Sequence, residues 1–151
     1  MSDGDLRAIF RRRLPSFDWL SIETALTEAG VPDSNFCCNG VEGFIEHKRT
    51  MGWTVPLRPA QVGWILRRTR AGGRVFIAVR RMSVSRRPAD ELWLIHGWAA
   101  KEAKAGGLKK LPRLSLIGCW EGGPGAWPWD RVAAALTGDG SWNGRHPSAK
   151  D

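Results

Sequence analysis

The alternation of apolar and polar residues divides the first third of the chain into short elements. Residues 5–13 pair an apolar edge with a basic edge and end just before a proline, which predicts a short amphipathic helix. Residues 16–29 carry apolar side chains at helical spacing, with Leu20 on the predicted buried side. We therefore expect a second helix there, and Gly30 is a suitable residue to end it.

A β-hairpin is predicted next. Asn39-Gly40 between apolar runs is the strongest short-range signal of a two-residue hairpin, and its register places Asp33 directly opposite Glu46. Facing like charges destabilise a sheet, so two carboxylates held there require a cation between them. Lys48 shares a face with Glu46, because side chains alternate along a strand. The alternative, three solvated strand positions, fits poorly with the apolar residues directly before Glu46.

The rest of the chain predicts strands alternating with helices and basic turns. With the hairpin, this pattern favours an α/β fold in which a mixed central β-sheet is flanked by helices. Residues 1–137 form a single domain, and the polar, Gly-rich residues 138–151 are expected to be a disordered tail. The further elements are a helix over 59–71, a buried strand over 74–80, a mobile loop over 81–88, a strand over 91–97, a helix over 98–105, a strand around 114–117 and a helix over 129–136.

Charge and cysteine usage narrow the class of protein. Lys and Arg number 23 against 15 acids, a net charge of +8, for which nucleic acid is the first polyanionic partner to consider. The cysteines include no CxxC pair, so neither a disulfide framework nor a zinc site is supported, and a reducing cytoplasmic location is expected. No run of 18 apolar residues predicts a membrane span, and the N-terminus lacks the apolar stretch of a secretory signal.

Several arginines are candidate contacts to DNA phosphates. Those at helix ends also complement the helix dipole, and those on helix faces are equally explained as solvated side chains. Tryptophans in the last third could stack on bases, although packing of a terminal helix is the commoner role. The candidate DNA-binding residues are Arg11, Arg12, Arg13, Arg67, Arg68, Arg80, Arg81, Arg86 and Arg87.

Glu23 and Gln61 lie close to the hairpin in sequence. Glu23 leans toward the core side of the predicted helix, where a carboxylate is costly unless it is paired or binds a metal ion. The alternative is an acid at the edge of the apolar stripe that reaches solvent. Gln61 falls in the first turn of the helix after the hairpin.

With Glu23, then Gly30-Val31-Pro32-Asp33, Glu46-His47-Lys48 and Gln61 in this order, the chain resembles the PD-(D/E)xK nuclease superfamily. Within it the chain is most similar to the small Holliday junction resolvases of archaeal and phage type. The resemblance covers about residues 16–97 and implies a restriction-endonuclease-like core, with residues 98–137 as a C-terminal extension. His47 departs from the apolar residue usual in the family. We expect its side chain to point to the opposite face of the sheet, with no chemical role.

The resemblance implies a catalytic set of Glu23, Asp33, Glu46, Lys48 and Gln61. Asp33, Glu46, the backbone carbonyl of His47 and Glu23 would bind Mg²⁺, or Mn²⁺ in its place, through hard oxygen ligands. The metal would activate water for in-line attack on a phosphodiester. Lys48 would hold that water or the developing negative charge, and Gln61 would position the lysine, the water or the phosphate.

The implied activity is that of a magnesium-dependent endodeoxyribonuclease in DNA recombination, cutting four-way junctions symmetrically as a homodimer. Three alternatives stay open: a nuclease of the same fold for other branched, flapped or duplex DNA, a non-catalytic DNA-binding module, and an RNA nuclease. The acidic cluster argues against the binding module, since holding phosphates needs no carboxylates. Apolar candidates for the dimer interface are Trp53, Trp93 and Trp98.

Overall fold

The computed structural model describes residues 5–22 and 29–138, which form an α/β protein. In this part of the chain a six-stranded mixed sheet is combined with four α-helices. The elements are α1 (Leu6–Arg13), β1 (Asp18–Ser21), β2 (Ser34–Cys38), β3 (Val41–Thr50), α2 (Pro59–Arg70), β4 (Val75–Ser83), β5 (Ala89–His96), α3 (Ala100–Gly106), β6 (Leu116–Trp120) and α4 (Trp129–Thr137), with short 3₁₀ turns between α3 and its neighbouring strands.

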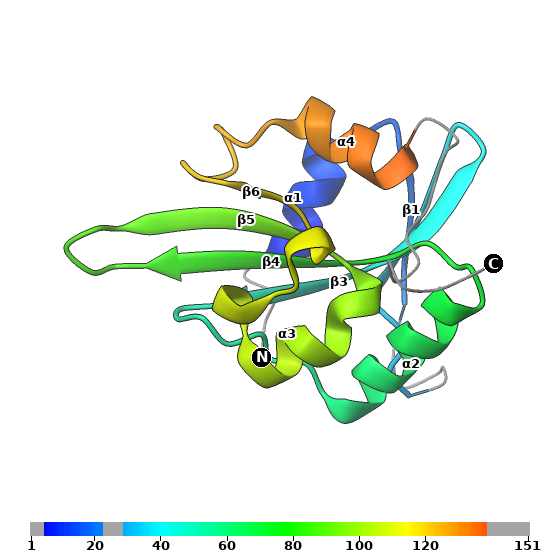
Figure 1. Cartoon of the computed structure of the whole chain (residues 1–151). Coiled ribbons are helices and arrows are strands. Elements are labelled where there is room, and N and C mark those ends of the chain that lie inside the picture. Colours follow the sequence, from blue (N-terminus) through cyan, green and yellow to red (C-terminus); the bar gives the residue numbers. More distant parts are fainter. Residues whose placement is uncertain (1–4, 23–28, 139–151) are drawn as a thin grey trace.

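The strands lie in the sheet in the order in which they occur along the chain. Every neighbouring pair is antiparallel except β3 and β4, which run parallel because α2 carries the chain back between them. Figure 1 shows α1 and α4 on one side of the sheet and α2 and α3 on the other. The sheet thus separates two helical layers, each with its own core.

The two cores differ in their side chains. Against α1 and α4 the sheet presents mainly aromatic and bulky residues such as Phe36, Ile45 and Phe76, whereas against α2 and α3 it presents Ile77 and Ile95. Val75–Val79 of β4 are at most 1% exposed, which confirms the prediction of a strand buried on both faces.

The predicted hairpin register is confirmed. Asn39 (φ 52°) and Gly40 (φ 78°) both have positive φ, as a type I′ turn requires, and Cys38 pairs with Val41. The ladder continues to Ser34 opposite Ile45, so the next positions along it are Asp33 and Glu46. The turn therefore fixes which carboxylates face each other.

The prediction of a helix over residues 16–29 is wrong where it can be compared. Asp18–Ser21 form strand β1, which pairs along its whole length with β2, and Leu20 is 60% exposed instead of buried. Trp19 stacks on Phe17 with ring centroids 5.5 Å apart and leans on Phe36. This aromatic packing and the strand pairing outweigh a helical spacing based on only a few apolar residues. Residues 23–28 lie outside the described part of the chain.

Most of the other predicted elements are confirmed within a few residues. Strand β4 continues to Ser83, so the first part of the predicted basic loop is strand, and β6 lies slightly later than predicted. Trp127 is 3% exposed and Trp129 packs edge-on against Phe10, which confirms the packing role of these tryptophans. Among the described helices, none is long and apolar enough to cross a membrane. The predicted tail falls almost wholly on residues 139–151, which are not described.

Candidate active site

Glu46 is the centre of a polar cluster on the α2 side of the sheet. Its side chain, in the middle of β3, is only 3% exposed. The amide Nε2 of Gln61, in the first turn of α2, donates a hydrogen bond to Glu46 Oε2 at 3.2 Å. The ammonium of Lys48 lies 4.0 Å from the same oxygen. Strand β3 and helix α2 thus bring Glu46, Lys48 and Gln61 together, as the sequence predicted.

The pKa of Glu46 depends on its burial and on the charged groups around it. Burial and, after it, the negative charge of Asp33 raise the pKa of Glu46 to about 8. The positive charges of Lys48 and Arg58 offset only part of this effect. The repulsion expected from the hairpin register is therefore present. Burial and the charge of Asp33 thus favour the protonated form of Glu46 when no cation is bound.

Asp33 has the opposite ionisation, because His47 binds its carboxylate. The backbone N–H of His47 donates to Asp33 Oδ2 at 3.1 Å, and the ring Nδ1 of His47 lies 2.8 Å from Oδ1. Burial by itself would raise the pKa of Asp33, but the interactions with His47 outweigh it, and the pKa is lowered. One carboxylate of the pair is kept ionised while the other tends to be neutral.

Sequence reasoning missed the contact between His47 and Asp33. The imidazole does lie on the expected face of the sheet, the α1 side, where it packs edge-on against Phe10 with centroids 4.8 Å apart. From there it still reaches the carboxylate of Asp33, the residue directly before β2. A usable signal existed, since a histidine facing a core needs a hydrogen-bond partner and an acid stands opposite its neighbour in the ladder.

Main-chain contacts hold the loop that carries Asp33 against the start of α2. Gly30 has φ +87°, and a Cβ at this position would overlap the carbonyl group of Ala60. Gln61 Oε1 accepts the backbone N–H of Arg58 at 2.9 Å, capping α2 with the same side chain that contacts Glu46. The glycine before Pro32-Asp33 is thus required by close backbone approach.

The donors present fit a small hard cation. In the described residues no three His, Cys, Asp or Glu side chains gather as metal ligands, and the predicted ligand Glu23 lies outside that part of the chain. Magnesium, however, usually binds proteins through one or two carboxylates and keeps several waters. Asp33 and Glu46 provide such a pair, and a divalent cation would relieve the repulsion that raises the pKa of Glu46.

The predicted DNA-binding arginines do not form one patch. Arg11, Arg12 and Arg13 end α1 on one side of the sheet, whereas Arg67 and Arg68 lie on α2 on the other. The remaining four occur along β4 and in its turn to β5, where Arg80, Arg81, Arg86 and Arg87 are found.

Two arginines of β4 are engaged in ion pairs with strand β5. Arg80 makes a bidentate pair with Asp90, at 2.9 and 2.7 Å, and Arg81 Nη1 lies 2.8 Å from Glu91 Oε1. The Arg81 guanidinium also stacks 3.6 Å above the centre of the Trp53 ring. These contacts link β4 to β5, and they are a sufficient structural explanation for the presence of both arginines.

The three tryptophans considered for a dimer interface separate into two groups. Trp98 is 6% exposed and belongs to the core between the sheet and α2 and α3. Trp53 and Trp93 meet edge to face, with centroids 6.2 Å apart, and both are half-buried. Of these three tryptophans, only Trp53 and Trp93 offer exposed surface to a partner.

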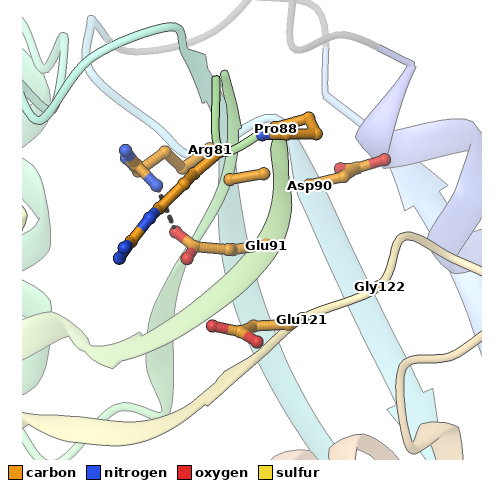
Figure 2. A pocket seen from close by; sticks show the side chains of 8 residues that line it. Arg81, Pro88, Asp90, Glu91, Glu121 and Gly122 are labelled. Atoms are coloured by element: carbon orange, nitrogen blue, oxygen red, sulfur yellow. Dashed lines mark hydrogen bonds and ion pairs between the residues drawn. The ribbon is translucent and has the colours of Figure 1, made fainter. Parts of the chain in front are cut away.

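A pocket of about 790 Å³ lies beside the β4–β5 turn, away from the Glu46 cluster. Figure 2 shows Glu91 directed at Arg81, with Glu121 of the segment after β6 below them. Its lining alternates in charge, since two arginines and three acids contribute. The lining includes Arg81 and Arg87 of the predicted DNA-binding set, but none of Asp33, Glu46, Lys48 and Gln61.

Comparison of the chain with protein-family models gave no match, and comparison with curated proteins gave none. The interpretation of the site therefore depends on its geometry and on the motif in the sequence.

Proposed function

We propose that this protein is a metal-dependent DNA endonuclease that cuts four-way junctions. One observation carries the proposal: a buried glutamate is placed between an ionised aspartate, a lysine and a glutamine that come from separate elements. A carboxylate with a raised pKa beside a second carboxylate is costly for a protein that needs only a stable fold. It is useful where a divalent cation is to be bound.

The arrangement of elements supports a restriction-endonuclease-like fold. The β2–β3 hairpin carries Asp33, Glu46 and Lys48, α2 follows with Gln61, and β4 returns parallel to β3. This is the order in which the resemblance to the PD-(D/E)xK nucleases places its acid, its E-x-K strand and its glutamine. The parallel pair puts α2 over the site face of β3, which is why Gln61 can reach Glu46.

In this proposal Asp33, Glu46 and the backbone carbonyl of His47 would hold magnesium, with Glu23 as a further ligand. When bound, the ion supplies Lewis-acid activation of water and neutralises charge at the phosphodiester. The Lys48 ammonium, a compact point charge near Glu46, stabilises the negative charge that develops on the phosphate. Gln61, fixed at both ends of its amide, keeps the Glu46 carboxylate in one orientation.

The choice of substrate follows from charge and from the resemblance. A net charge of +8 favours binding to a polyanion, and the phosphate backbone of DNA is such a partner. Cutting two strands of a junction symmetrically needs two sites related by a twofold axis, so the active species is a homodimer.

The test is cleavage of a labelled immobile four-way junction beside a duplex of matched sequence, with Mg²⁺ or with EDTA. Paired symmetric nicks on the junction alone, lost in EDTA, are expected. Asp33→Asn should abolish cutting while leaving DNA binding intact or stronger, because one negative charge near phosphate is removed. Glu42→Gln, which changes an exposed acid of β3, is the matched control and should cut normally. Metal-dependent cutting of both DNAs would support a nuclease but contradict the preference for four-way junctions. Unchanged cutting by Asp33→Asn would remove the site assignment.

A further inference from the structure

His47 is a buried histidine on the α1 side of the sheet, and its ring contacts Asp33 of the candidate site. Its side chain has no exposed surface, and the only polar contact of the ring in the described structure is the 2.8 Å approach of Nδ1 to Asp33 Oδ1. The other ring nitrogen, Nε2, is buried with no hydrogen-bond partner in the described part of the chain. A buried imidazole that leaves one nitrogen unsatisfied is costly, so packing alone does not explain this residue.

The contact determines which nitrogen carries the proton. A carboxylate that is to bind a metal ion is ionised, and an ionised carboxylate can only accept hydrogen bonds. Nδ1 of His47 is therefore the donor. Because the backbone N–H of the same residue donates to the other oxygen, His47 holds both oxygens of Asp33 at once.

This two-point hold leaves Asp33 able to bind a cation. Each carboxylate oxygen has about two acceptor positions, of which His47 uses one on Oδ1 and one on Oδ2. The Asp33 side chain is 21% exposed, so part of it can be reached from solvent. The ring is fixed in turn by Phe10 of α1, which packs edge-on against it.

We propose that His47 is a positioning residue. Its ring packs against Phe10, and its Nδ1–H donates to the Asp33 carboxylate and fixes that carboxylate in the orientation that binds the metal ion. The inference deepens the proposed function and rests on it for the identity of the ligand. The hydrogen bond itself can be tested without any metal. His47 touches neither substrate nor metal through its side chain and acts only through Asp33.

The first experiment measures Mn²⁺ binding to the metal-free protein by electron paramagnetic resonance, with His47→Asn compared to His47→Leu. Asparagine places an N–H donor at the same distance along the side chain as Nδ1, whereas leucine fills more of the buried space but donates nothing. We expect His47→Leu to weaken Mn²⁺ binding at least tenfold and His47→Asn to stay within about threefold of the wild type. A role in packing alone predicts the reverse order.

Two controls separate the inference from the proposed function. His96→Asn changes the histidine of β5, which stacks on Phe76 and Trp98 instead of contacting Asp33, and should bind Mn²⁺ like the wild type. Asp33→Asn should lose the ion. If Asp33→Asn binds Mn²⁺ normally, the proposed metal site fails. If Asp33→Asn loses the ion but His47→Leu binds it like the wild type, the positioning role fails and the site stands.

The second experiment needs no variant to fold. Long-range ¹H–¹⁵N correlation spectra of the metal-free wild type report the tautomer of each histidine ring. His47 is expected as the form protonated on Nδ1, and a ring protonated only on Nε2 would overturn the inference. In junction cleavage, His47→Leu should lower kcat and raise the Mg²⁺ concentration required, with DNA affinity unchanged.

Discussion

The substitution Glu46→Gln isolates the electrostatic cost of the candidate site. In the folded metal-free protein the pKa of Glu46 is about 8, against 4.5 for an unperturbed glutamate. The folded state therefore binds the proton more tightly than the unfolded state does. Below pH 4.5 both states are protonated and Glu46 imposes no penalty. As pH rises toward 8, the unfolded state ionises freely and the folded state is disfavoured.

The size of this penalty follows from the two pKa values. One pKa unit corresponds to about 1.4 kcal/mol, so between pH 5 and pH 8 Glu46 should lower the free energy of unfolding by at most on the order of 4 kcal/mol. Glutamine is neutral, has nearly the same shape and can still accept the Gln61 amide. Glu46→Gln should therefore gain stability relative to the wild type as pH rises through this window.

The measurement is urea unfolding from pH 5 to pH 8 in EDTA, followed by circular dichroism. Glu42→Gln, at an exposed position of β3, is the control and should track the wild type within about 0.5 kcal/mol at every pH. Repeating the series in Mg²⁺ should stabilise the wild type at pH 8 and leave Glu46→Gln unchanged, because the ion binds the ionised pair. If Glu46→Gln and the wild type keep a constant difference from pH 5 to pH 8, Glu46 does not lie in the repulsive surroundings described above.

Two further substitutions test how the site is held, and a third tests the stability of helix α2. Gly30→Ala should destabilise the fold by more than about 2 kcal/mol, since its φ is +87° and its Cβ would meet the Ala60 carbonyl; a smaller loss in urea unfolding would contradict that contact. Gly63→Ala, in α2 with open space around its Cβ, should instead stabilise by about 0.5–1 kcal/mol in the same assay. Gln61→Ala removes the α2 cap and the Glu46 contact, so we expect a loss of about 1–2 kcal/mol and slower cleavage; wild-type values in both assays would show that Gln61 positions nothing.

The parts of the site that were predictable depend on local rules. Asn39-Gly40 specifies a type I′ turn, the turn specifies the register, and the register brings Asp33 to Glu46. Pro59 and the glycines after α2 bound that helix in the sequence, which places Gln61 in its first turn. None of these steps requires knowledge of distant contacts.

The parts that failed depend on tertiary contacts. The segment after α1 has helical spacing, yet it adds a strand to β2 because Trp19 can then pack on Phe17 and Phe36. No local pattern distinguishes these outcomes. The clamp of His47 on Asp33 was missed because alternation along β3 assigns the ring to the other face. The end of a strand, where a carboxylate can be reached from both faces, escapes that rule.

The contact between Gly30 and Ala60 has a consequence for how the chain folds. The β2–β3 hairpin is local and can form within microseconds, which already brings Asp33 to Glu46. Gln61 arrives only when α2 docks and its first turn meets the loop at Gly30. Until then the hairpin brings the two acids together without the hydrogen bond from Gln61 to Glu46, so repulsion between two ionised carboxylates opposes docking. Refolding of the metal-free chain should therefore be faster at pH 5 than at pH 8, because the repulsion between Asp33 and Glu46 is weaker when Glu46 is protonated.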